Sequence, residues 1–139
     1  MTLLRHSYIE GRWIESGGER RFDITNPTHA EVIGTLVSSS LSDVDRAVAA
    51  AQRAFLGWAS LTPDERANYL QRVFDALTEQ SEAIAQSITT EVGSTISLSR
   101  GVQAGAAISK FDYYADYLRH FECEEHFGDT PVQREPIGV

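Results

Sequence analysis

The chain has 139 residues, of which 42% are apolar and 23% charged, a composition that excludes whole-chain disorder and collagen-like structure. Twelve basic against 20 acidic side chains give a formal net charge of −8, which argues against nucleic acid as a partner because a phosphate backbone requires a basic face. One cysteine cannot form an internal disulfide, and neither an apolar leader nor a run of about 18 apolar residues is visible. We therefore expect a cytoplasmic protein with no membrane partner.

Residues 1–37 are predicted to form short strands joined by turns. Residues 8–14 place Glu10 and Gly11 between two pairs of β-prone residues, and glycine at the second turn position adopts positive φ without a Cβ clash, which favours a tight hairpin. Further turns are expected at 17–18 and 26–29, and further strands at 22–24 and 31–37.

Residues 38–121 are predicted to be helical. A capping box of Ser40 with Asp43, or of Ser42 with Asp45, would begin the first helix. Its apolar side chains recur at steps of four, three, four and three residues, which predicts one apolar face. They are Val44, Val48, Ala51, Phe55 and Trp58.

A second helix is predicted to begin at Thr62, which caps it, with Pro63 in the first helical position and Glu65 reaching back to the cap amide. A break is expected at Ser81, and Gly93 is a plausible helix end. The inward-facing residues are predicted to be Leu70, Val73, Phe74 and Leu77, then Ile84, Ile88 and Val92.

A further helix is predicted from about Ser97 to Phe121. Its first half carries small residues at 101–107, which would let a neighbouring helix approach closely. Its aromatic second half is expected to bury a larger area. Gly101 and Gly105 also have the spacing of small residues in membrane helices, but the charged residues that flank them argue against that interpretation.

Residues 122–139 are predicted to be an acidic connection followed by extended chain. Pro131 and Pro136 both disfavour a helix, and Pro136 suits only an edge or the start of a strand.

Cys123 is the one candidate thiol nucleophile. Its acidic neighbours Glu122, Glu124 and Glu125 and its place near a helix C-terminus disfavour the thiolate that catalysis requires.

His120, Cys123 and His126, with Glu124 and Glu125 alongside, offer ligands that zinc or copper would accept. The second, distant ligand pair typical of zinc sites is missing, so an exposed polar connection is favoured over a metal site.

The remaining candidates have structural interpretations. His6 and His29 are expected in turns, and the glycines at 17–18 and 101–105 lack the context of a phosphate-binding loop. The acidic pairs at 43 and 45 and at 64–65 are explained as first-turn charges that complement the helix dipole, and Glu124-Glu125 makes no site alone. We therefore predict no catalytic, cofactor-binding or metal-binding residue in this chain.

A series of motifs nonetheless follows in a specific order. They are Tyr8-Ile9-Glu10-Gly11-Arg12-Trp13, Ile24-Thr25-Asn26-Pro27-Thr28, Glu31-Val32-Ile33-Gly34, the run from Asp43 to Ala51 leading to Phe55 and Trp58, Glu65-Arg66-Ala67 with Leu70, Glu91-Val92-Gly93, Tyr113-Tyr114-Ala115 and Arg134-Glu135-Pro136-Ile137-Gly138-Val139. Each motif is weak alone. The order and spacing of the motifs from Tyr8 to Val139 nonetheless resemble the N-terminal part of the aldehyde dehydrogenase superfamily.

The resemblance implies an α/β family fold, of which this chain is an N-terminal fragment: mainly α-helical, with β-hairpin strands first and an extended arm last. It implies opening strands over 1–37 and, over 38–121, helices that pack on the cofactor-binding sheet. Residues 122–139 would contain an acidic connection, an arm for subunit association at about 127–135, and the beginning of the first strand of the cofactor domain. It also implies NAD- or NADP-dependent oxidation of an aldehyde to a carboxylate through a cysteine thiohemiacetal.

The family's nucleophile, its glutamate and its cofactor-binding glycine turn lie downstream of the motif at 134–139, and Cys123 does not match the nucleophile's position. The resemblance therefore implies a chain that is inactive alone, binds no NAD or NADP by itself, and associates with itself or with aldehyde dehydrogenase subunits. A non-enzymatic helical interaction module and a small metal-binding protein remain the alternatives. Phe55, Trp58, Phe74 and Leu77 are expected to be left exposed and to promote aggregation.

Overall fold

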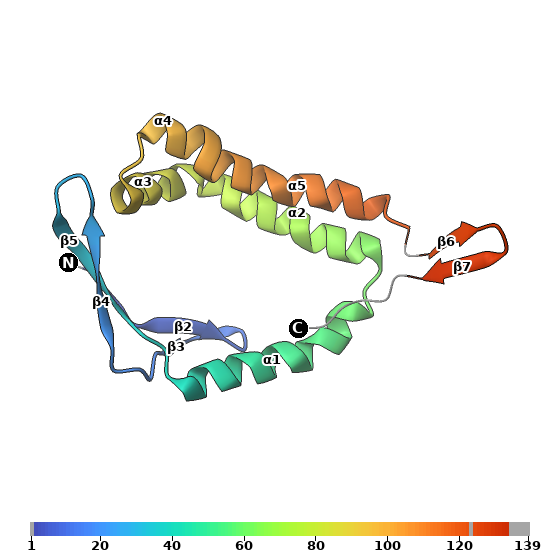
Figure 1. Ribbon diagram of the computed structural model, residues 1–139, viewed down its shortest axis with the longest axis horizontal. Helices are drawn as coiled ribbons and strands as arrows, with labels where there is room; N and C mark the ends of the chain where they lie inside the picture. Colours follow the sequence, from blue (N-terminus) through green and yellow to red (C-terminus); the bar gives the residue numbers. More distant parts are fainter. Residues whose placement is uncertain (1, 123, 134–139) are drawn as a thin grey trace.

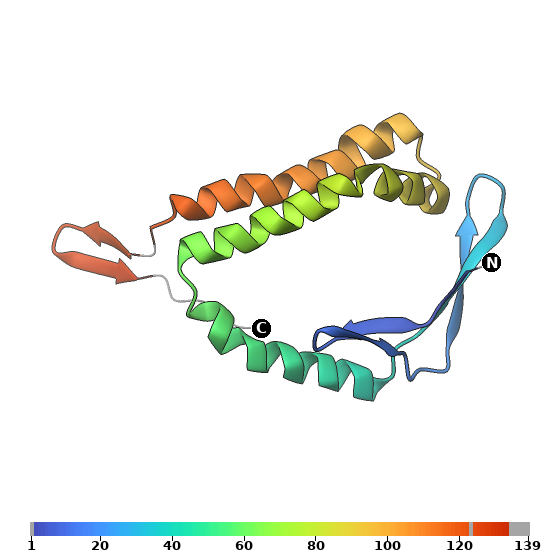
Figure 2. The ribbon, with the colours of Figure 1, turned by 180° about the vertical axis from the view of Figure 1, so that it is seen from behind.

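The computed structural model describes residues 2–122 and 124–133, which form an open arch (Figure 1). The helical pair α2 and α5 makes one side of the arch, α1 the other, and the strands close one end, as the view from behind also shows (Figure 2). The elements are β1 (Thr2–Leu4), β2 (His6–Ile9), β3 (Arg12–Glu15), β4 (Arg21–Asn26), β5 (Glu31–Val37), α1 (Leu41–Ala59), α2 (Pro63–Glu79), α3 (Ser81–Val92), α4 (Ile96–Leu98), the π-helix η1 (Ser99–Ala104), α5 (Gly105–Arg119), β6 (Glu124–Phe127) and β7 (Thr130–Gln133).

The first hairpin forms where the sequence predicts it. β2 and β3 pair in antiparallel register, with Tyr8 opposite Trp13, and their rings meet edge to face at a centroid distance of 5.3 Å. Glu10 and Gly11 have φ values of 55° and 78°, the left-handed pair that a tight two-residue hairpin requires.

The other strands form a three-stranded sheet in the order β1-β5-β4. β1 runs parallel to β5, and β4 runs antiparallel to it. The predicted turn between β4 and β5 is confirmed: Asn26 Oδ1 accepts a hydrogen bond of 2.8 Å from the Thr28 amide, which fixes the chain reversal locally.

Both predicted helix starts are confirmed, the first with Ser40 and Asp43 rather than Ser42 and Asp45. Ser40 Oγ accepts from the Asp43 amide, and the Asp43 carboxylate accepts from the amides of Ser40 and Gly17 at 2.9 and 2.8 Å. These amide donors hold the pKa of Asp43 below its usual value. Asp43 therefore caps α1 and joins it to the loop after β3.

The core lies where α3 and η1 cross, and it confirms the prediction that small residues let helices approach closely. Ala85, Ala104 and Ile108 are buried at the crossing, and Phe74 and Leu77 pack against them. The expectation that Phe74 and Leu77 stand exposed is therefore wrong, because this crossing shields them. The predicted break at Ser81 is confirmed, and Gly93, at φ 76°, ends α3 as predicted.

The helix predicted over 97–121 contains an unpredicted π-helical turn, η1. The Gly105 amide donates to the Arg100 carbonyl, five residues back. A Cβ on Gly105 would lie 2.7 Å from that carbonyl oxygen, so glycine permits the wider turn. Ser99, fully buried in η1, bonds through its hydroxyl to Thr89 at 2.9 Å and to Gln103 at 3.2 Å.

The apolar face of α1 has no matching layer in the described structure. Val44, Val48 and Trp58 are 51%, 50% and 42% exposed. The main contact of α1 is with the first hairpin, where Arg53 and Glu10 form an ion pair of 2.7 Å. The exposure expected for Trp58 is thus confirmed, whereas Phe55 is partly buried.

One expectation for the end of the chain is corrected. The aromatic half of α5 does not bury a large area, since Tyr113, Tyr114 and Tyr117 are about half exposed. After α5 the chain is extended, as predicted: residues 124–133 form the antiparallel hairpin β6–β7, with His126 opposite Pro131. The cofactor-domain strand expected to begin at 137–139 lies outside the described residues.

Candidate functional site

The metal hypothesis places His120, Cys123 and His126 together at the end of α5. His120 Nδ1 lies 2.9 Å from the carbonyl oxygen of Asp116. His126 Nε2 lies 3.1 Å from Glu124 Oε1. Each imidazole is thus held by its own neighbour, and no group of three or more His, Cys, Asp or Glu side chains within 2–122 and 124–133 has the geometry to hold a metal ion.

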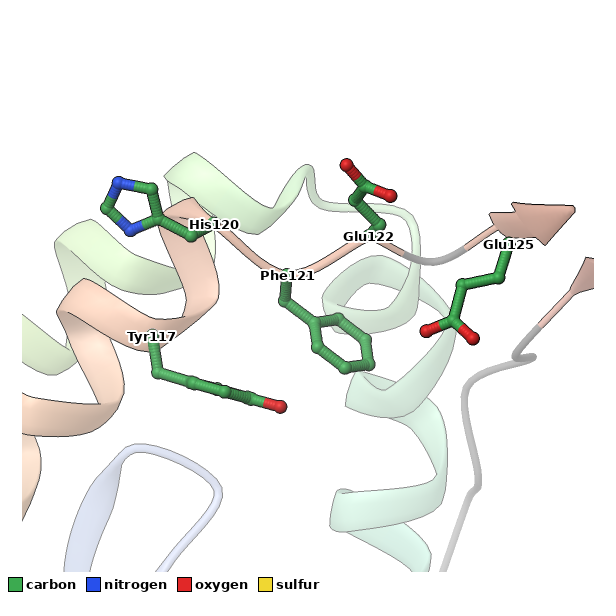
Figure 3. Close-up of a pocket in the computed structure, with 5 residues that line it drawn as sticks. All are labelled: Tyr117, His120, Phe121, Glu122 and Glu125. Carbon is green, nitrogen blue, oxygen red and sulfur yellow. The ribbon is translucent and has the colours of Figure 1, made fainter.

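Figure 3 shows how the side chains at this end of α5 are arranged. Five of them line a shallow recess: Tyr117, His120, Phe121, Glu122 and Glu125. The ring of His120 points away from the rings of Tyr117 and Phe121, which lie on the side of α5 that faces the first hairpin and α1. Cys123 lies outside the described residues, so its proposed lack of a catalytic role stays a prediction.

One member of each acidic pair at a helix start caps its helix: Asp43 at α1 and Glu65 at α2. Glu65 Oε2 accepts from the Thr62 amide at 2.8 Å and from the Thr62 hydroxyl at 3.0 Å. These bonds lower the pKa of Glu65, and Asp43 is engaged in the same way at α1. Carboxylates held as caps are acceptors in the helix framework rather than acids or bases poised for a substrate.

Gly17, Gly18, Gly101 and Gly105 do not lie in the setting of a phosphate-binding loop. A phosphate-binding glycine loop lies between a strand and the N-terminus of a helix, whereas Gly17 and Gly18 lie between strands β3 and β4. Gly101 lies inside the π-helix and Gly105 follows it. His29 lies in the turn between β4 and β5, as predicted, whereas His6 is in β2 rather than in a turn.

A second feature of α5 has the composition of a binding surface. Lys110, Tyr114 and Tyr117 recur at steps of four and three residues, so they occupy one face of α5. Phe121 follows just after the end of the helix, and its ring lies 5.7 Å from that of Tyr117. We call this set the α5 stripe. The stripe was not predicted, although the spacing of its residues in the sequence identifies it.

An apolar recess opens beside the stripe. It lies between α2 and α5 and is lined by Leu70, Lys110, Phe111 and Tyr114. Tyr113 and Tyr114 meet edge to face at 5.2 Å, and Tyr113 stacks on Tyr117 at 6.5 Å. Rings held by one another in this way present a preorganised apolar surface.

Comparison with known proteins identifies the family of this fold. Residues 13–139 match the sequence model of the aldehyde dehydrogenase family. The chain belongs to the aldehyde dehydrogenase family. This finding confirms the α/β fold class and the superfamily predicted from the order of motifs.

Individual aldehyde dehydrogenases agree over the same region. A 3-succinoylsemialdehyde-pyridine dehydrogenase from Pseudomonas sp is 37% identical over all of this chain and 29% of its own length. A putative aldehyde dehydrogenase from Staphylococcus aureus is 36% identical over 95% of this chain and 28% of its own. The chain thus spans less than a third of the length of these relatives.

Solved aldehyde dehydrogenase structures contain the same arrangement of elements. An aldehyde dehydrogenase C variant from Pseudomonas syringae, in complex with NAD+ and octanal, superimposes with a TM-score of 0.89 at 35% identity, covering 96% of this chain and 27% of that one. A betaine aldehyde dehydrogenase variant from Staphylococcus aureus, in complex with NAD+, gives a TM-score of 0.79 at 32% identity, over 92% of this chain and 25% of that one. The open arch is therefore the shape that this segment has within longer members of the family.

The described part of the chain contains no helix that is both long and apolar enough to span a membrane.

Proposed function

We propose that this chain is the amino-terminal part of an NAD- or NADP-dependent aldehyde dehydrogenase that oxidises an aldehyde to a carboxylate. The observation that carries the proposal is the agreement of nearly the whole chain with one segment of family members complexed with NAD+. The chain's own contribution is structural: its described residues form helix caps, a small core and exposed apolar faces.

Three parts of the chain take three structural roles in this proposal. Residues 1–37 supply the opening strands, and 38–121 supply helices that cover the cofactor-binding sheet. Residues 122–139 supply an acidic connection, an arm for subunit association and the start of the first cofactor-domain strand. The exposed face of α1 supports the second role, because a surface helix with a bare apolar stripe requires a covering layer.

A chimera tests the proposal. The 139 residues replace the matching segment of the Pseudomonas relative, to which they are 37% identical. We expect aldehyde-dependent reduction of NAD or NADP by the folded chimera, and none by the relative without this segment. A folded, assembled chimera without activity would contradict the proposal.

An assay of the isolated chain tests the expectation that it has no activity by itself. Incubated with NAD or NADP and a panel of aldehydes, the purified chain is expected to reduce neither cofactor. If an aldehyde- and thiol-dependent activity that forms NADH or NADPH co-purified with the chain, the chain would carry its own catalytic groups.

A second candidate function is a non-enzymatic interaction module, which the half-exposed tyrosines of α5 and the β6–β7 hairpin favour. In that case the chain associates with intact aldehyde dehydrogenase subunits without adding activity. Co-expression with an intact homologue followed by size-exclusion chromatography tests this, and separate elution of the two chains counts against it.

A metal-binding role predicts stoichiometric zinc after dialysis. The separate bonding of His120 and His126 gives that role no support, and metal analysis of the purified chain provides the test. A zinc content near zero would remove this alternative.

A further inference from the structure

The continuous helix formed by α4, η1 and α5 has one buried face, and the spacing along that face is irregular at a single step. The buried residues are Ser99, Ala104, Ile108 and Ala115. Steps of four and seven residues, as after Ala104, keep side chains on one face of an α-helix. The step of five from Ser99 to Ala104 would turn them about 140° apart in a regular α-helix.

The π-turn of η1 brings Ser99 and Ala104 onto the same face. Its hydrogen bond closes over five residues, from the Gly105 amide to the Arg100 carbonyl, so the turn holds one residue more than an α-helical turn. The extra length lies on the outer side of the helix. Gly101 is exposed there, where a Cβ would meet nothing within 4 Å, and Val102 is 58% exposed.

The contacts that hold this helix to α3 lie on either side of the outer residues. Before them, the Ser99 and Thr89 hydroxyls bond at 2.9 Å, and Arg100 pairs with the first turn of α3. After them, Ala104 and Ile108 pack in the core. Removal of one outer residue would shorten the step of five to four, so a continuous α-helix could keep all of these contacts. The fold of the described chain therefore does not require the extra residue.

We propose that η1 contains a one-residue insertion, Gly101, which the enzyme keeps for its reaction rather than for its fold. The inference rests on the proposed function. A π-turn inside an α-helix is rare and is frequent at functional sites, and glycine at an exposed helical position weakens the helix further. The insertion is thus a positioning feature: it sets the direction of the exposed residues 101–102 relative to α5.

Deletion of Gly101 separates the two roles. In the isolated chain, the deletion variant is expected to keep its helical circular dichroism, and hydrogen exchange of the remaining residues of 96–105 should slow, because an α-helical turn replaces the π-turn. The same deletion is then made in the chimera with the Pseudomonas relative. There it should lower kcat/KM for the relative's aldehyde by roughly tenfold to a hundredfold, the cost of a small misplacement, while the melting temperature stays the same or rises.

Gly57→Ala in α1 is the matched control for added helix stability. Gly57 is also exposed, and a Cβ there would meet nothing within 4 Å, so alanine strengthens a helix without changing the number of residues. The chimera with Gly57→Ala should keep the kcat/KM of the unaltered chimera. An equal loss of activity in both variants would show that helix stability, rather than the insertion, affects the reaction.

Three further outcomes would overturn the inference. They are loss of helix or faster exchange in the isolated deletion variant, a deletion chimera that fails to fold and assemble, and a folded deletion chimera as active as the unaltered one. The last outcome would leave the proposed function in place, because the unaltered chimera would be active. An inactive unaltered chimera would instead reject the proposed function and this inference with it.

Discussion

Arg100 and Glu82 form a bidentate ion pair between η1 and the first turn of α3. Arg100 Nε lies 2.7 Å from Glu82 Oε2, and Nη2 lies 2.6 Å from Oε1. This contact joins the π-turn to a helix 18 residues earlier in the chain. The Arg100 guanidinium, with a smaller contribution from Gln86, lowers the pKa of Glu82 to about 2.

Glu82→Gln is expected to loosen the π-turn. Since folding lowers the pKa of this carboxyl from 4.5 to about 2, its stabilising contribution is complete above pH 4.5 and is lost as the pH falls toward 2. Hydrogen exchange of residues 96–105 should therefore be faster in the variant than in the unaltered chain at pH 7, and the difference should diminish with added salt.

Glu79→Gln, at the exposed end of α2, is the control for the loss of one negative charge. It should leave exchange in 96–105 unchanged. Equal acceleration by both variants would show that net charge rather than the Arg100 contact is responsible.

Local signals account for the features that the sequence predicted. The caps at Ser40 and Thr62, the turn at Glu10 and Gly11 and the helix end at Gly93 depend on residues within about four positions of one another, so sequence spacing is enough to identify them. The family followed from the order of many such weak motifs along the chain.

The missed features depend on contacts that sequence spacing does not encode. The π-turn combines Gly105 with a pairing between Glu82 and Arg100, and the burial of Phe74 requires the crossing of α3 and η1. For the candidate site, the sequence placed His120 and His126 near each other but could not show that each bonds to its own neighbour. The direction of those side chains is set by the helix end and by the register of β6 and β7.

Thr62→Ala is expected to destabilise the start of α2, and Thr62→Ser is its control. The hydroxyl accepts from the Glu65 amide at 3.2 Å, and removal of such a cap costs about 1 kcal/mol. Serine keeps the acceptor, so the serine variant should lose far less. Urea titration followed by helical circular dichroism measures the difference, and identical losses in the two variants would contradict a capping role.

The isolated chain is expected to be loosely packed and prone to association. Val44, Val48 and Trp58 expose a continuous apolar stripe on α1, and patches of this kind recruit other apolar surfaces. We expect strong binding of an apolar fluorescent dye and a broad thermal transition. A sharp cooperative melt from a monodisperse monomer would show that the chain needs no covering layer.

Alanine at two glycines of the π-helical region should have opposite effects. Alanine favours helix over glycine by about 1 kcal/mol, and at Gly101 a Cβ would meet nothing within 4 Å, so Gly101→Ala should stabilise the isolated chain. At Gly105 the Cβ would lie 2.7 Å from the Arg100 carbonyl. Gly105→Ala must therefore displace the π-turn and move Arg100 away from Glu82.

Hydrogen exchange of residues 96–105 measures both effects. It should slow in Gly101→Ala and accelerate in Gly105→Ala. A stabilising Gly105→Ala would mean that the π-turn converts to α-helix at no cost, and that the Arg100–Glu82 contact does not depend on it.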